Sequence, residues 1–135
     1  DFVLFIYREY RFRLRPETVE TVNRYAPAVR AAASYIDENF RKRLDGDLLC
    51  RKALMSRRGF YNAFRLICGM SPLEYIRHRR VLSAHDLLVK SDLSLFEISR
   101  CSGFNNQLYF SNVFRQMSGV APSSFREDWK LPPEI

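Results

Sequence analysis

One pattern occurs twice in this chain, about fifty residues apart, and it restricts the fold more than any other feature. Each copy holds a Phe-x-x-x-Phe-Arg segment, then a Gly, a Pro three residues later and an aromatic residue three further on. The first copy comprises Phe60, Phe64, Arg65, Gly69, Pro72 and Tyr75, and the second Phe110, Phe114, Arg115, Gly119, Pro122 and Phe125. Phenylalanines four residues apart share one helix face, Gly ends a helix in a left-handed cap, and Pro begins the next helix. The pattern therefore predicts one helical unit built twice.

The positive charge of the chain is concentrated near the first copy. The net charge is +7 over 135 residues, and residues 41–80 contain eleven cationic and three acidic side chains, a net +8. Residues 1–40 are balanced, and residues 81–135 carry a net −1. We therefore expect the excess charge to lie on the first copy, where it would attract a polyanion such as nucleic acid or an anionic membrane. Arg outnumbers Lys by 18 to 4, which suits forked contacts to phosphates and guanine edges.

The remaining composition narrows the class of protein. A hydrophobic fraction of 47% is ample for a folded core. Cys50, Cys68 and Cys101 have no metal-type spacing, and the first two occupy apolar helix positions, so we expect buried thiols in a reducing cytoplasm and no cofactor. No segment approaches the roughly 18 apolar residues of a membrane span, so a membrane is not an expected partner.

The N-terminal part of the chain gives weaker signals. Residues 2–14 fit a strand or the tail of a helix, and we expect residues 1–26 to end a preceding regulatory domain or to form a linker. Pro16 and Glu17 mark a helix start. Pro27 is expected to interrupt that helix and to begin a second one that runs to about Arg43.

The rest of the chain predicts two short-helix pairs separated by a long helix. The first helix-turn-helix is expected at about 45–70. It consists of a cap at 45–47, a short helix over 48–54 and a helix over 57–68 that is capped by Ser56. A long helix follows over about 72–90. Ser94 caps a short helix through Cys101, and Asn106 starts a helix to about Ser118, which places the second helix-turn-helix at about 94–119. A final helix is expected over about 122–130.

Several of these positions resemble the signature of the AraC/XylS family of bacterial transcription regulators. The matching positions are Arg80, Ala84, Leu87, Leu88, Ile98, Ser99, Arg100, Gly103, Phe104, Tyr109, Phe110, Phe114, Arg115, Gly119, Val120, Ala121 and Pro122. The resemblance covers about residues 30–128. It implies an all-α fold of about seven helices, with two helix-turn-helix subdomains joined by a long linker helix in a DNA-binding domain over residues 27–131. Ala53-Leu54 stands where relatives often carry Leu-Gly, and Leu108 stands where Ser is usual.

The resemblance implies a partner and the side chains that meet it. The partner is double-stranded DNA of an operator or promoter, with RNA polymerase and a ligand-binding domain of the full-length chain as further candidate partners. With Phe60, Phe64 and Ile67 buried, the first recognition helix should expose Arg57, Arg58, Tyr61, Asn62 and Arg65. By resemblance Arg58, Tyr61 and Asn62 reach base edges, whereas Arg65 is expected to hold a phosphate. The second recognition helix should expose Gln107, Leu108, Ser111, Asn112 and Arg115.

The two helices differ in cations, three on the first and one on the second. We therefore expect the first helix-turn-helix to dominate affinity and base readout. Two helices on one linker should address successive major grooves, about 34 Å apart. A linker of about 18 residues spans roughly 27 Å, which is compatible.

Two other classes of function compete with DNA binding. A protein-interaction or dimerisation module without its own DNA specificity is the main alternative, because residues 1–25 contain several apolar side chains. An enzyme is disfavoured, since His78 and His85 share a helix face without a Cys, Asp or Glu to complete a metal set. The reactive Cys of DNA-repair methyl acceptors lies in a Cys-rich zinc module that this sequence lacks.

Overall fold

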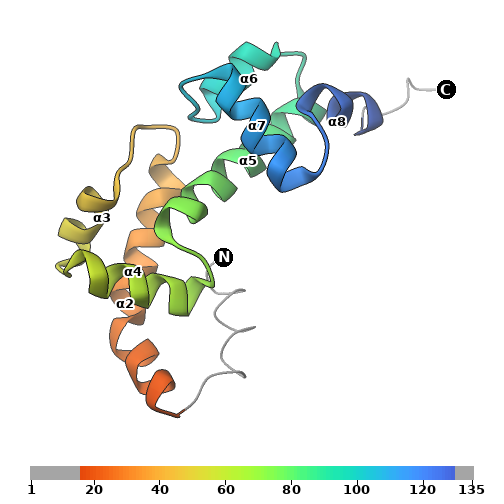
Figure 1. Ribbon diagram of the computed structural model, residues 1–135. Helices are drawn as coiled ribbons and strands as arrows, with labels where there is room; N and C mark the ends of the chain where they lie inside the picture. The colour runs from red at the N-terminus through yellow and green to blue at the C-terminus, as the bar shows by residue number, and fades with distance from the viewer. Residues whose placement is uncertain (1–15, 130–135) are drawn as a thin grey trace. The chain divides into compact units, whose positions relative to one another are not determined.

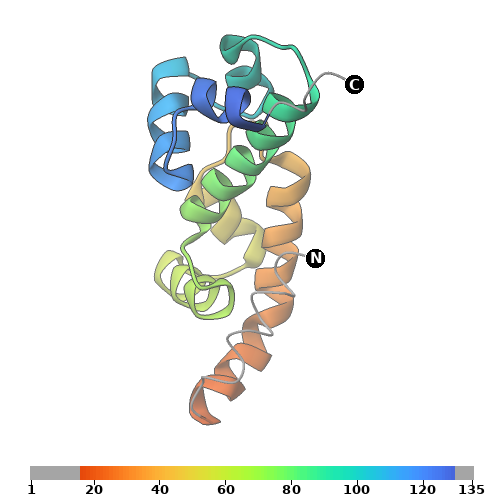
Figure 2. The ribbon, with the colours of Figure 1, turned by 90° about the vertical axis from the view of Figure 1, so that its right-hand side faces the viewer.

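The computed structural model describes residues 16–129, and in this range every regular element is an α-helix (Figures 1 and 2). The seven helices are α2 (Pro16–Asn39), α3 (Gly46–Ala53), α4 (Arg57–Cys68), α5 (Pro72–Lys90), α6 (Leu95–Cys101), α7 (Gln107–Ser118) and α8 (Pro122–Trp129). The predicted all-α class with two helix-turn-helix pairs and a long helix between them is confirmed. The expectations for residues 2–14 lie outside the described residues.

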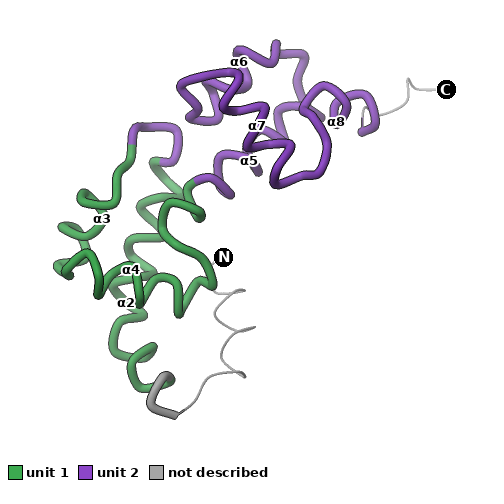
Figure 3. Tube along the Cα trace, in the orientation of Figure 1, with its two compact units in different colours: residues 1–39, 44–76 green, residues 40–43, 77–135 purple. Residues whose placement is uncertain are grey.

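The chain divides into two compact units, which Figure 3 distinguishes by colour. Unit 1 contains α2, α3, α4 and the first residues of α5, and unit 2 contains Phe40–Arg43, the rest of α5, α6, α7 and α8. In unit 1, α2 packs against α3 and α4, and Phe60, Phe64 and Tyr75 are fully buried. The Tyr75 hydroxyl donates to Asp37 Oδ1 (2.8 Å), which ties the start of α5 to α2.

Unit 2 has its own hydrophobic core. α7 packs against α6 and α8, and its Phe110 and Phe114 are fully buried. The core residues come from α5, α6, the turn and α7, and they are Val81, Ala84, Leu88, Ile98, Phe104, Phe110, Val113 and Phe114. Each copy of the repeat therefore supplies the centre of one unit.

The caps predicted from the repeat are present. Gly69 and Gly119 both adopt the left-handed conformation, at φ 75° and 83°, and end α4 and α7. At the N-terminal ends, the N–H of Gly59 donates to Ser56 Oγ (3.2 Å) and that of Tyr109 to Asn106 Oδ1 (2.9 Å). These bonds satisfy backbone donors that lack partners within the helix.

The prediction of a break at Pro27 is wrong, because α2 runs unbroken through it. Proline removes only one backbone hydrogen bond, and here its ring lies on the exposed side of the helix. Val22, before Pro27, and Val29 and Ile36, after it, are all buried. We infer that the packing of this continuous apolar face outweighs the lost bond, so that residues 16–26 continue into the helix of residues 27–39.

The ends of two other helices differ from the predictions. α2 stops at Asn39 and not near Arg43, and the carbonyls of Phe40 (2.8 Å) and Lys42 (3.1 Å), which follow its end, accept hydrogen bonds from Arg80. α3 begins at Gly46, two residues earlier than expected, since Asp45 is its N-cap. It ends at Ala53 because Leu54 adopts the left-handed conformation at φ 56°.

Candidate nucleic-acid interface

The outer face of α4 carries the predicted side chains, held in place by the buried opposite face. Phe60 and Phe64 are fully buried, and the Phe64 ring meets Tyr75 edge-on at a centroid distance of 5.6 Å. Because the helix repeats every 3.6 residues, this anchoring turns Arg58, Asn62 and Arg65 to the outside, and all three are exposed. None of the three forms a side-chain hydrogen bond or ion pair with any residue that the structure describes. Their donors are therefore available to a ligand.

Arg57 and Tyr61, by contrast, are engaged within unit 1. Arg57 Nη1 donates to Asp47 Oδ1 of α3 (2.8 Å), its guanidinium lies 5.0 Å from the centre of the Tyr61 ring, and its Nη2 is 3.5 Å from the Tyr61 hydroxyl. Tyr61 is only half-exposed, because its hydroxyl closes over Gly46, where any β-carbon would collide with it. Both partners of the Arg57–Asp47 pair are largely exposed, so the pair contributes about 0–1 kcal/mol and can be exchanged for another anion.

The outer face of α7 is more neutral. Gln107, Leu108, Asn112 and Arg115 are exposed and Ser111 is half-buried, as the positions of Phe110 and Phe114 predicted. Leu108 exposes 70% of its surface. Arg115 is the only cation on this helix.

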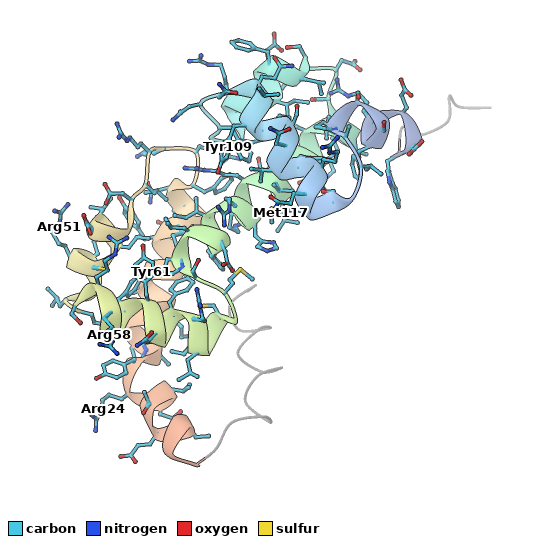
Figure 4. The ribbon with its side chains drawn as sticks, in the orientation of Figure 1. Arg24, Arg51, Arg58, Tyr61, Tyr109 and Met117 are labelled. Carbon is cyan, nitrogen blue, oxygen red and sulfur yellow. The ribbon has the colours of Figure 1, made fainter. Side chains whose placement is uncertain are left out.

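Sequence reasoning missed two features of the surface of unit 2. Tyr109, in the first turn of α7, is 47% exposed and meets Phe104 edge-on at 5.9 Å. Its counterpart fifty residues earlier is Gly59, so the repeat gave no sign of it. Arg100 is exposed on α6 and lies 5.6 Å from the centre of the Phe96 ring. Figure 4 shows Arg58 and Tyr61 on α4, and Tyr109 and Met117 at opposite ends of α7.

The predicted location of the positive charge is wrong. Six of the eleven cations of residues 41–80 belong to unit 2, and these are Arg41, Lys42, Arg43, Arg77, Arg79 and Arg80. Among the described residues, unit 1 holds seven cationic and seven acidic side chains, whereas unit 2 holds ten and five, a net +5. The reason is that the α2–α3 loop and α5 from Arg77 on pack with unit 2, so linear position did not indicate spatial position.

The cysteines Cys50 and Cys68 and the histidine His85 are packed inside the two units, away from the outer faces of α4 and α7. Burial raises the pKa of the Cys68 thiol to about 12, with Asp37 adding to the effect, and burial also raises the pKa of Cys50. His85 packs between Phe114 and Phe125, with ring centroids 4.7 and 4.5 Å away, and shares a hydrogen bond with Ser118 Oγ (2.7 Å). Within residues 16–129, no group of three His, Cys, Asp or Glu side chains is arranged to hold a metal, and no helix is long and apolar enough to cross a membrane.

Comparisons with known proteins identify this arrangement. A family model described as a helix-turn-helix domain matches residues 49–128. The HTH-type transcriptional regulator ExsA of Pseudomonas aeruginosa is 40% identical over 68 residues, which are 50% of this chain and 24% of ExsA. The chain thus spans about a quarter of the length of that curated relative.

Two solved structures are similar over most of the chain. One is the DNA-binding domain of AdpA, a global transcriptional factor, in complex with a target DNA; it has a TM-score of 0.72 and 31% identity, over 75% of this chain and 91% of that one. The other is a probable AraC family transcriptional regulator from Rhodopseudomonas palustris, with a TM-score of 0.69 and 27% identity, over 78% of this chain and 99% of that one. From the match to the family model and these likenesses, the chain belongs to the AraC-type helix-turn-helix DNA-binding domains of transcription regulators.

Proposed function

We propose that this chain binds double-stranded DNA sequence-specifically in the cytoplasm of a bacterium, with α4 and α7 entering successive major grooves. The observation that carries the proposal is the outer face of α4, where Arg58, Asn62 and Arg65 are exposed and have no partner among the described residues. Arg presents two donors that match guanine, and Asn matches adenine. Arg65, one turn further along, is proposed to hold a phosphate.

We also propose that the first helix-turn-helix supplies most of the base readout. The support is the chemistry of the two faces and not their net charge: α4 presents Arg58 and Asn62, whereas the corresponding part of α7 presents Gln107, Ser111 and Asn112 without a cation. Tyr61 and Leu108 complete the proposed base-facing set. Arg57 joins it by exchanging Asp47 for DNA, and Arg115 is proposed as a phosphate contact of α7.

The partners of the full-length regulator are proposals of the same kind. ExsA is about four times as long as its matched part, so a ligand-binding domain within a longer chain and RNA polymerase are proposed as further partners, with activation of transcription as the outcome.

Selection of bound sites from a random duplex pool, followed by electrophoretic shifts at increasing salt, tests the function. A DNA-binding domain should enrich one sequence and lose affinity steeply as salt rises, because phosphate contacts release counterions. Absence of any shift at low salt with every duplex would contradict the proposal and favour a protein-interaction module.

Substitution of Arg58 tests the assignment of base readout. Arg58→Ala should cost about 1–3 kcal/mol of binding and relax specificity at one base pair, since a forked guanine contact is lost. Asn112→Ala should cost less. Arg24→Ala, which removes an exposed cation from α2, serves as the charge control. A loss at Asn112 equal to that at Arg58 would refute the dominance of the first unit.

A further inference from the structure

A short cationic loop belongs to unit 2 although it precedes the first helix-turn-helix in the chain. This basic loop is Phe40–Arg43, drawn in the colour of unit 2 in Figure 3. Arg41, Lys42 and Arg43 are all exposed, and none forms an ion pair with a described residue. The α6–α7 turn and α7 contain no acidic residue either. The loop thus contributes three unneutralised charges to unit 2.

The loop is held by hydrogen bonds from the side chains of Arg80 and Arg41 to backbone carbonyls, and these bonds do not involve the side chains of Lys42 and Arg43. Arg80 of α5 donates from Nε to the Phe40 carbonyl (2.8 Å) and from Nη2 to the Lys42 carbonyl (3.1 Å). Arg41 Nε donates to the Cys101 carbonyl at the end of α6 (3.1 Å). The Phe40 ring is buried, with the Arg41 guanidinium 4.5 Å from its centre. Lys42 and Arg43 take no part with their side chains, so their ammonium and guanidinium groups face solvent.

Gly103 shows how closely the loop approaches the α6–α7 turn. A β-carbon at Gly103 would lie 2.6 Å from the Phe40 carbonyl oxygen and 3.1 Å from the Arg41 Cα. The next residues of the turn lead directly into the first turn of α7, where Tyr109 is exposed. The basic loop therefore lies at the turn of the second helix-turn-helix, between the helix that crosses the DNA backbone in such a motif and the N-terminal end of the helix that enters the major groove.

We propose that the basic loop binds backbone phosphates beside the groove that α7 enters, with Lys42 and Arg43 as the phosphate ligands and Arg80 as the residue that positions them. This inference rests on the proposed function, and it adds two sequence-independent contacts to the single phosphate contact proposed for Arg115 of α7. Phosphate contacts fix the position of a protein on DNA and carry no base preference.

The salt dependence of binding tests the loop. We compare the 135-residue chain with the variant K42Q/R43Q, and with the matched variant R24Q/R30Q, which removes two exposed cations from α2. The probes are a duplex selected from the random pool and an unrelated duplex of equal length. Both altered side chains are exposed, and neither forms a hydrogen bond or ion pair with a described residue, so the fold should be unchanged.

Loss of two phosphate contacts should reduce the slope of log affinity against log salt by about 1.8. Between 50 and 200 mM salt the unaltered chain should then lose about tenfold more affinity than K42Q/R43Q. The ratio of affinities for the two duplexes should stay the same, and R24Q/R30Q should keep the original slope.

Three results would overturn the inference. An unchanged slope in K42Q/R43Q, while the unaltered chain binds its selected duplex, would remove the loop from the interface and leave the proposed function standing. Equal slope changes in both variants would show a general effect of net charge. Failure of the unaltered chain to bind either duplex at low salt would remove the proposed function together with the loop.

Discussion

Leu54 occupies a backbone conformation that favours glycine. It is at φ 56° where α3 ends, and its side chain is 92% exposed. The equivalent position in the second unit is Gly103. The backbone N–H of Leu54 donates to the carbonyl of Arg51, and that of Gly103 donates to the carbonyl of Arg100. A left-handed residue with a β-carbon costs about 1–2 kcal/mol, and the exposed leucine buries little surface in return.

Leu54→Gly should therefore stabilise the chain by about 0.5–1 kcal/mol, after the larger unfolded-state entropy of glycine is subtracted. Urea denaturation measures the change. Leu54→Ala is the control, since it removes the exposed leucine but keeps the β-carbon, and it should give no comparable gain. Destabilisation by the glycine variant would refute the assigned strain.

His85 makes the stability of unit 2 depend on pH. Burial lowers the pKa of His85, and the nearby Asp86 opposes this only in part. The unfolded chain binds the proton at the ordinary pKa of about 6.5, whereas the folded chain resists it. The resulting stability is complete above about pH 6.5 and is lost as the pH falls through the lower folded value.

Thermal unfolding between pH 5 and 7 should accordingly show a melting temperature that decreases as the pH is lowered. His85→Gln should make the melting temperature less dependent on pH. The glutamine keeps a polar group near Ser118 but does not titrate. A variant with the same pH profile as the unaltered chain would show that other groups cause the dependence.

At the scale of elements, the two glycines that follow helices in unit 2 allow the cost of backbone strain to be distinguished from the cost of steric overlap. Gly103 and Gly119 are both left-handed, at φ 94° and 83°. A β-carbon at Gly119 would meet nothing within 4 Å, whereas one at Gly103 would collide with the backbone of the basic loop.

Gly119→Ala should cost about 1 kcal/mol, from backbone strain alone. Gly103→Ala should cost about 2–4 kcal/mol, because overpacking against the loop adds to the same strain. Calorimetric unfolding of both variants gives the comparison. Equal costs would mean that the loop yields to the new methyl group without loss.

The elements that the sequence predicted well are those determined by residues close together in the chain. The caps Ser56, Ser94 and Asn106 each accept a bond from the N–H three residues on, a spacing visible in the sequence. The outward direction of Arg58, Asn62 and Arg65 followed in the same way from the buried phenylalanines. The bonds of Arg80 to the α2–α3 loop, by contrast, join residues about forty positions apart, so the path of the chain after the C-terminal end of α2 could not be predicted from local sequence.

At the scale of the whole molecule, the repeat predicted two units but not their boundaries. Both units contain the Phe pair, the Gly cap and the Pro start, as expected. The distribution of charge between them was not predictable, because it depends on where the α2–α3 loop packs. Arg57 illustrates the same limit, since its pairing with Asp47, ten residues away, follows from the approach of two helices and not from helical periodicity.

The crossing of the α2–α3 loop into unit 2 means that neither half of this protein is a contiguous cassette. A gene segment beginning at Pro72 would encode α5 to α8 but omit Phe40–Arg43, so Arg80 would lose both of its carbonyl acceptors. Recombination that exchanged only the second helix-turn-helix between regulators would therefore combine the α2–α3 loop of one protein with the α6–α7 turn of another, and the two would have to fit each other. Because unit 2 includes residues that precede α3 and α4 in the chain, we expect the two units to be exchanged between genes only together.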